Sequence, residues 1–234
     1  MLVRLHLLAC LVLVAAAGSG RADERDDDAL IVGSEGFLRA HPDLRFRNAG
    51  ELAYQGGRYE EALGDFRDAA RYGDKPSQAM LAAMLWNGDG VARDRAQAYA
   101  WMDLAAERGY RDFAITRERY WLALDDGERK RALELGEAIY AEYGDEVAKP
   151  RLNRELRRAM TQVTGSRVGR AGTVVVRVKG PDGRTRPIDG TLYYSPRYWQ
   201  PEQYWQWQDR MWREPPKAHV EVGPLQPADG AGSR

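Results

Sequence analysis

Small and apolar side chains in the middle of the chain recur at helical spacing. Within residues 62–70, and again within residues 98–106, they occupy positions i, i+4, i+7 and i+8, which share one face of a helix. Glycines follow both runs, where helices are expected to end. The surrounding pattern predicts further helices at residues 29–39, 44–54, 111–124, 128–143 and 150–163.

The last third of the chain has a different pattern. Residues 173–178 are a β-branched run, and residues 180–183 form a tight turn with proline early and glycine late. Residues 188–194 then complete a predicted hairpin, and residues 219–222 are a candidate third strand. Because a bare hairpin is marginal in water, we expect it to pack on the helices or to dimerise.

The two helical runs are copies of one pattern at a constant offset of 36 residues. The copies are Ala62-x3-Phe66-x2-Ala69-Ala70-x2-Gly73 and Ala98-x3-Met102-x2-Ala105-Ala106-x2-Gly109. A third copy, in which the pattern is only partly kept, follows at residues 111–143. One helix pair cannot bury its apolar face alone, so we expect at least three stacked pairs or caps. The alternative is a non-repetitive bundle in which the alanine spacing recurs by chance.

The second copy resembles a known repeat. Its matching features are the turn Gly88-Asp89-Gly90-Val91, then Asp94, Ala98-x2-Trp101 and Ala105-Ala106-x2-Gly109. This stretch resembles the Sel-one-like repeat (SLR), a relative of the tetratricopeptide repeat. The first copy has a shorter turn and is more similar to a tetratricopeptide unit, while the third lacks the Gly-x-Gly turn. The resemblance covers residues 45–145 and implies an α-solenoid that binds proteins or peptides and has no catalytic residues.

The first 22 residues have the pattern of a secretory signal peptide. Arg4 precedes an apolar run over residues 5–17, and small residues follow up to Ala22, where we expect cleavage. The run has 13 residues, too few to span a bilayer at about 20. The alternatives are a lipoprotein modified at Cys10 and an uncleaved anchor. We expect an exported protein, periplasmic or secreted, without stable membrane insertion after cleavage.

Few side chains suited to catalysis remain after this cleavage. Cys10, the single cysteine, is removed, and the remaining histidines are His41 and His219. Thiolate chemistry, disulfides and a structural zinc site are therefore not expected. The chain also contains no phosphate-binding loop, dinucleotide fingerprint or serine-nucleophile motif. We predict no enzymatic activity, with no catalytic residues, no cofactor and no metal site.

Charge is strongly polarised along the chain. Residues 23–148 carry a net charge of −10, residues 149–187 carry +9, and residues 188–234 carry −1. This split predicts an electrostatic partner for each half. That partner is either the other half, through arginines of the helix at 150–163, or an external anion such as a cell-wall polymer, lipopolysaccharide or acidic protein. Export argues against nucleic acid.

Two segments supply the candidate partner-binding residues. In the glycine-rich loop 165–172, Arg167 and Arg170 could clamp an anion beside backbone N–H groups, although we prefer to interpret the loop as a flexible link. A predicted helix starting at Pro201 lies in an aromatic-rich segment, which is either core filling or an exposed platform for a partner chain or sugar ring. Its candidate residues are Trp199, Tyr204, Trp205, Trp207 and Trp212.

Together these features predict a mainly α protein: a short α-solenoid of antiparallel helix pairs with a small C-terminal β-hairpin and an aromatic-rich segment. The expected organisation is a signal peptide at 1–22, the solenoid with its closing helix at 23–164, the hairpin and aromatic segment at 165–224, and a disordered tail at 225–234. The predicted function is an exported, non-catalytic scaffold or adaptor that binds a protein or peptide in the bacterial envelope. The alternative is binding of an envelope glycan or anionic lipid.

Overall fold

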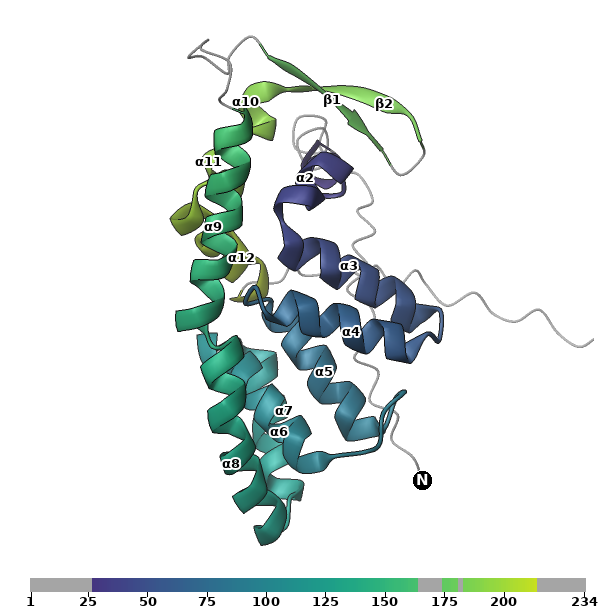
Figure 1. Cartoon of the computed structure of the whole chain (residues 1–234), viewed down its shortest axis with the longest axis vertical. Coiled ribbons are helices and arrows are strands. Elements are labelled where there is room, and N and C mark those ends of the chain that lie inside the picture. Colours follow the sequence, from purple (N-terminus) through teal and green to yellow (C-terminus); the bar gives the residue numbers. More distant parts are fainter. Residues whose placement is uncertain (1–26, 164–173, 181–182, 214–234) are drawn as a thin grey trace, which may run out of the picture.

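The protein is a short helical solenoid with a two-stranded hairpin at one end (Figure 1). The computed structural model describes residues 27–163, 174–180 and 183–213. The predicted signal peptide, the loop with Arg167 and Arg170, the candidate strand at 219–222 and the tail lie outside these residues.

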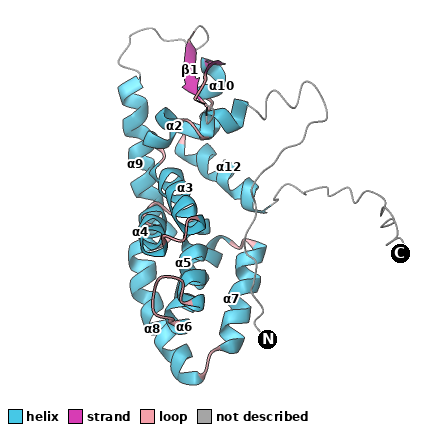
Figure 2. Cartoon of the chain, turned by 90° about the vertical axis from the view of Figure 1, so that its right-hand side faces the viewer, coloured by secondary structure: helices cyan, strands magenta, loops and turns pink. Residues whose placement is uncertain are grey.

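The predicted mainly α fold is confirmed, and the helices follow one another in antiparallel pairs. A helical turn at residues 27–32 precedes them. Two closely packed pairs (α3 with α4, α5 with α6) and a third, splayed pair form the solenoid, and one long helix, α9, follows. In the third pair, α7 and α8 both pack on α6 and hardly on each other (Figure 2). The bounds are α2 Glu35–Ala40, α3 Pro42–Gln55, α4 Tyr59–Ala70, α5 Lys75–Asn87, α6 Arg95–Ala105, the 3-10 turn η1 Ala106–Arg108, α7 Arg111–Ala123, α8 Asp126–Tyr143 and α9 Asp145–Val163.

The repeated alanines lie where helices pack closely. Ala69 and Ala105 are both fully buried. Ala62, Ala70 and Ala105 belong to one apolar cluster that runs through the first two pairs. On α3, a Cβ at Gly50 would lie 2.8 Å from the ring of Phe66, so this contact between α3 and α4 requires glycine. Gly73 and Gly109 end their runs at positive φ, 79° and 69°. The small residues of the repeat therefore set the spacing of the stack.

Side-chain caps fix where several helices begin. Asp74 accepts a hydrogen bond from the backbone N–H of Ser77 at the start of α5, at 3.0 Å. Helix α8 begins two residues before the predicted start at 128, because Asp125 caps it. Its carboxylate accepts from Glu128 N–H at 2.8 Å, and the Glu128 carboxylate accepts from Asp125 N–H at 3.0 Å. This reciprocal pair is a capping box, which places Asp126 one residue inside α8.

The closing helix is longer than its sequence pattern suggested. It begins at Asp145 instead of Pro150, which lies within its second turn. Leu152 and Leu156 are fully buried, and they share an apolar cluster with Tyr204 and Trp205 from near the end of the described chain. In Figure 1, α8 and α9 follow one another along one side of the molecule.

The hairpin packs on the helices of its own chain, which is one of the two arrangements that the sequence predicted. Strands β1 (Val175–Lys179) and β2 (Thr185–Asp189) are antiparallel, with Val176 opposite Ile188. Val178 and Ile188 are buried in a second apolar cluster that also contains Phe37 of α2. This cluster gives the hairpin the support that two strands alone lack.

The second strand ends earlier than expected. Residues 190–193 form the short helix α10 (Gly190–Tyr193) because the Asp189 carboxylate accepts a hydrogen bond from Thr191 N–H at 2.7 Å and caps this turn. Two further helices follow, α11 (Pro196–Trp199) and α12 (Pro201–Arg213). None of the helices in the described part of the chain is both long and apolar enough to cross a membrane.

Candidate functional site

Helix α12 lies against the starts of successive repeat helices (Figure 2). Its Tyr204 donates a hydrogen bond to the carboxylate of Asp43 in the first turn of α3. Further along, its Asp209 accepts from the hydroxyl of Tyr110, just before α7, at 2.5 Å. Trp212 then packs on Phe113 of α7, with ring centroids 5.8 Å apart. One helix from the end of the chain therefore contacts the first and third helix pairs.

Trp205 is the anchor between α12 and the two elements beside it. Its indole N–H donates to Asn153 of α9 at 2.9 Å, and the ring packs on Leu152 and Leu156. The Arg108 guanidinium lies 4.7 Å and the Lys149 ammonium 5.4 Å from the ring centroid. Both distances are within the range of cation–π attraction.

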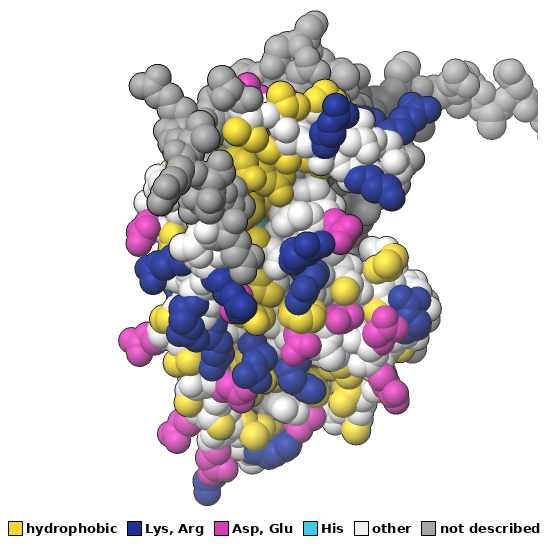
Figure 3. Space-filling view, turned by 45° about the horizontal axis from the view of Figure 1, so that its top comes forward, with side chains coloured by type: hydrophobic (Ala, Val, Ile, Leu, Met, Phe, Trp, Pro, Cys, Tyr) yellow, Lys and Arg dark blue, Asp and Glu magenta, His cyan; other side chains and the backbone are white. Residues whose placement is uncertain are grey.

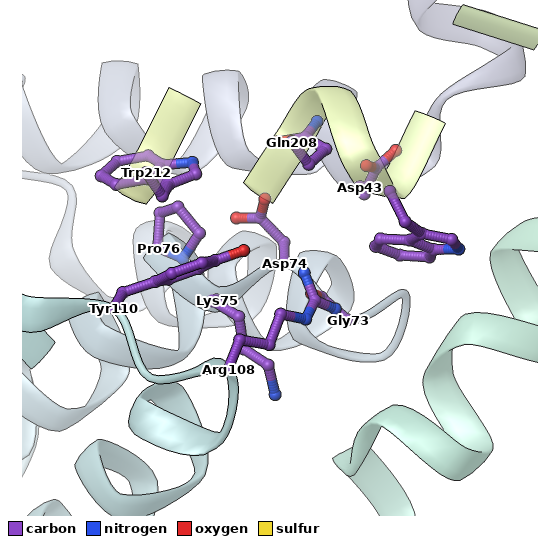
Figure 4. Close-up of a pocket in the computed structure, with 10 residues that line it drawn as sticks. Asp43, Gly73, Asp74, Lys75, Pro76, Arg108, Tyr110, Gln208 and Trp212 are labelled. Atoms are coloured by element: carbon purple, nitrogen blue, oxygen red, sulfur yellow. The ribbon is translucent and has the colours of Figure 1, made fainter. Parts of the chain in front are cut away.

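A buried ionic network lies beside Trp205, and Figure 4 shows two of its members, Lys75 and Arg108. Lys75, at the start of α5, is fully buried and donates to the Glu107 carboxylate at 2.5 Å and to the Leu104 carbonyl at 3.1 Å. Asp145, at the start of α9, lies 3.2 Å from the Lys75 ammonium and accepts two hydrogen bonds from Arg108 at 2.8 Å. The network thus joins the second helix pair to the closing helix.

The groups of this network stabilise one another's charged forms by pairing. Burial lowers the pKa of Lys75, and the neighbouring Asp145 only partly offsets this. Burial alone would raise the pKa of Asp145, but hydrogen bonds and charge from Arg108, with further help from Lys75 and Lys149, outweigh it. The pKa of Asp145 therefore lies well below its usual range.

Two titratable groups lie at the junction of α2, α3 and α12. Burial raises the pKa of Asp43 to about 7, although the bond from Tyr204 acts in the opposite direction. The Asp43 Oδ1 atom has no hydrogen-bond partner in the described part of the chain. Burial also lowers the pKa of His41 to about 4, although its ring nitrogens lie 2.8 Å from the Phe37 carbonyl and 2.7 Å from the Tyr198 carbonyl. Both groups are therefore neutral near pH 6.

Little space remains between α12 and the repeats. The cavity between Asp43, Lys75 and Trp205 has a volume of about 10 Å³, the room of about one water molecule. A shallower surface depression of about 260 Å³ lies at the starts of α6 and α8, but its Arg131 and Asp94 pair with each other at 2.6 Å. Among the described residues, no group of three or more His, Cys, Asp or Glu side chains could hold a metal ion. Among the described residues, this cavity between α12 and the repeats has room for about one water molecule and not for a small-molecule ligand.

The structure distributes the five candidate aromatics over three apolar clusters and buries most of them inside the protein. Trp199, Tyr204 and Trp205 are buried, with exposed fractions of 4%, 0% and 9%. These three therefore fill the core between the hairpin, α9 and the repeats instead of forming an exposed platform. Trp207 and Trp212 are half-buried and keep part of their surface accessible.

The sequence did not indicate the polar residues that hold α12. Asp43, Lys75, Arg108 and Asp145 lie at helix starts or in turns, where charged side chains are usually solvated caps. The one signal available was their position beside the repeat glycines, since Arg108 directly precedes Gly109 and Lys75 follows Gly73 by two residues.

Comparison with known proteins gave one match of fold. No family model matches the chain, and no curated protein matches it. A solved structure that matches is c5321, a protective antigen present in uropathogenic Escherichia coli strains and displaying an SLR fold. The two are 23% identical, the match covers 56% of this chain and 27% of that chain, and the TM-score is 0.41. This chain therefore corresponds to about a quarter of the length of the structure it matches.

Proposed function

We propose that this protein is a non-catalytic repeat scaffold that binds a protein or peptide partner in the bacterial cell envelope. The observation that supports this most is the docking of α12 on the starts of the repeat helices. Tyr204 and Trp205 anchor it in buried positions, and Asp209 and Trp212 extend the contact to the third pair. Apolar and aromatic anchors at helical spacing are how a groove binds a helix.

The partner then meets a surface that α12 helps to form. Met211 is 45% exposed, and Trp207 and Trp212 are half-buried on either side of it in the sequence. Aromatic side chains that are packed against the protein on one side and accessible on the other are typical anchors of protein interfaces. We assign this exposed side of α12 to partner binding.

Placement in the envelope rests on the pattern of residues 1–22, which resembles a secretory signal. Cell fractionation, together with N-terminal sequencing of the purified protein, tests this part. A processed chain that begins at Asp23 and is recovered with the envelope supports it. An unprocessed cytoplasmic chain contradicts it.

The alternative of sugar binding receives less support from the structure. Stacking on a sugar needs open ring faces, and Trp199, Tyr204 and Trp205 have theirs packed against protein. Arg167 and Arg170, the other half of that hypothesis, lie outside the described residues. Binding of an anionic envelope polymer through these arginines stays a prediction.

Crosslinking in cells followed by purification tests the scaffold. Wild type is compared with Met211→Lys, which places a charge on the assigned surface, and with Leu122→Lys as control. Leu122 lies at the end of α7 and is 77% exposed. We expect one reproducible protein partner with wild type and control, and at least about tenfold less with Met211→Lys, a loss of 1.4 kcal/mol of binding energy. Equal recovery with all three chains would contradict the assignment.

A further inference from the structure

The outer face of α9 carries arginines without acidic partners. Arg154, Arg157 and Arg158 are exposed, and none of them pairs with a carboxylate in the described part of the chain. Arg151, half-buried on the same side, donates to two backbone carbonyls, those of Arg71 at 3.1 Å and Glu142 at 2.6 Å. The sequence left open whether these arginines pair with the acidic half of the same chain or with an external anion. For Arg154, Arg157 and Arg158, pairing within the described part of the chain is not seen. In Figure 3, Lys and Arg side chains gather on the left of the view, the side of α9 in Figure 1.

The outer face of α4 carries the opposite charge. Glu61 and Asp68 are exposed and Asp65 is half-buried, while the other side of the helix packs in the core. Partial burial raises the pKa of Asp65, and the like charges of Glu61 and Asp68 raise it further. The one ion pair in this group joins Glu61 to Arg58 of its own helix end at 2.7 Å, and both side chains are more than half exposed. These carboxylates therefore repel one another and lack a strong cationic partner.

The two faces match in spacing. Arg151, Arg154 and Arg158 are separated by three and then four residues, whereas Glu61, Asp65 and Asp68 are separated by four and then three. At 1.5 Å per residue, both sets have steps of about 4.5 and 6 Å along their helices, in opposite order. Antiparallel helices would therefore place every arginine opposite a carboxylate.

We propose that the basic face of α9 binds the acidic face of α4 in a second copy of this chain. In the antiparallel register, Arg158 faces Glu61, Arg154 faces Asp65 and Arg151 faces Asp68 of the other copy. The residues used lie away from α12, so this inference does not depend on the proposed partner surface.

Within one chain the two faces cannot meet. The Arg71 carbonyl at the end of α4 already contacts Arg151 of α9, so the end of α4 meets the side of α9. Figure 1 shows α4 crossing toward α9 instead of running alongside it. A second copy related by a two-fold axis allows both contacts at once, α9 on α4 and α4 on α9, and closes the assembly as a dimer.

The mass of the purified full-length chain in solution tests the proposal first. We expect dimers by sedimentation equilibrium at about 0.05 M salt and monomers at about 1 M salt, because the Debye length falls to about 3 Å and screens the pairs. A monomer at low salt overturns the proposal, as does a dimer that is insensitive to salt.

Charge reversal tests the register. One variant carries Arg154→Glu and Arg158→Glu, and the other carries Glu61→Lys and Asp65→Lys. Each alone is expected to be monomeric at low salt, since its own faces then repel. Mixed in equal amounts, the two variants are expected to form dimers again, because both contacts regain opposite charges. Failure of the mixture to dimerise, although each variant keeps its helical circular dichroism, overturns the proposed register.

Matched controls separate the contact from net charge. Arg119→Glu with Lys130→Glu, and Glu134→Lys with Glu137→Lys, alter charge by the same amounts at exposed positions of α7 and α8. These variants are expected to dimerise like wild type, and loss of their dimers would count against the proposal. Binding to anionic phospholipid vesicles tests whether the basic face of α9 binds a membrane instead of a second copy. A wild-type chain that stays monomeric, and binds the vesicles unless Arg154 and Arg158 are reversed, overturns the second copy as partner.

Discussion

Tyr204 of α12 donates its phenolic hydrogen bond to Asp43 of α3, which precedes it by 161 residues. Both residues are buried, with exposed fractions of 0% and 2%. Gln208, one turn further along α12, donates to the Tyr204 oxygen at 2.8 Å. This polar chain lies inside an aromatic core, where an unmade hydrogen bond is costly. It therefore makes the docking of α12 sensitive to the loss of single polar atoms.

Replacing Asp43 by Asn should change how stability depends on pH. The pKa of Asp43 is raised to about 7, so its contribution to folding falls as pH rises from about 4 to 7. The pKa of His41 is lowered to about 4, so its contribution rises over pH 4 to 6.5. In wild type the two slopes nearly cancel. Asp43→Asn removes the first slope and keeps that of His41, so urea unfolding should show stability rising by up to about 3 kcal/mol over this range. A flat profile for Asp43→Asn contradicts the assignment.

The imidazole of His41 should be neutral at pH 6. Burial lowers the pKa of His41. The two carbonyls that face its ring nitrogens favour the protonated ring, but their effect on the pKa is smaller. Nitrogen chemical shifts of the His41 ring, followed by NMR from pH 4 to 7, measure this directly. A protonated ring at pH 6 would mean that the carbonyls dominate over burial.

Replacing Tyr204 by Phe should destabilise the protein by about 1–3 kcal/mol at neutral pH. The change removes the donor to Asp43 and the acceptor for Gln208, and it leaves both groups buried. The exposed Tyr59 gives the matched control, and Tyr59→Phe should stay within about 0.5 kcal/mol of wild type. Equal effects in chemical denaturation would show that the Tyr204 hydroxyl makes no net contribution.

Enlarging the repeat alanines should strain the stack. Ala69→Leu and Ala105→Leu each insert bulk at a fully buried position and should cost about 1–3 kcal/mol. Ala141, exposed on α8, provides the control Ala141→Leu, for which no such loss is expected. Thermal unfolding of the three variants measures the difference. Unchanged melting of both buried variants would show that the alanines do not set the helix spacing.

Replacing Lys75 by Met should test the ionic network under Trp205. The change leaves Glu107 without its buried cation, whereas Asp145 keeps Arg108 and Lys149. Because breaking a buried ion pair costs about 3–5 kcal/mol, we expect the free energy of unfolding, measured with urea, to fall by about 3 kcal/mol. Lys130→Met, at an exposed site of α8, should change little. A stabilised Lys75→Met variant would indicate that desolvation of the lysine exceeds its pairing energy.

The sequence predicted the solenoid well because its signal is local. The spacing of Ala62, Ala69, Ala98 and Ala105 depends only on the period of a helix, and all four are fully buried. Boundaries were less well predicted where a side-chain cap decided them. Asp189 ended the second strand early by capping α10, and α9 extended back past Pro150 to Asp145.

The docking of α12 could not be predicted from the sequence. Its period placed Tyr204 and Trp207 on one helix face, but the choice of neighbour depends on contacts such as that of Tyr204 with Asp43. Spacing also cannot distinguish a buried tryptophan from an exposed one, so core filling and an open platform were equally compatible with it. Burial of Trp205 against Leu152 resolves this for one anchor.

The contact between the first long helix and the last has a consequence for biosynthesis. A ribosome completes every repeat before it adds residues 201–213, so the nascent chain carries an uncovered aromatic and ionic surface until those residues have been added. Contacts over such sequence separations form slowly, and unfinished surfaces of this kind attract other chains. Messages truncated before Pro201 should therefore yield products that aggregate or are degraded, even though every helix pair is encoded in full.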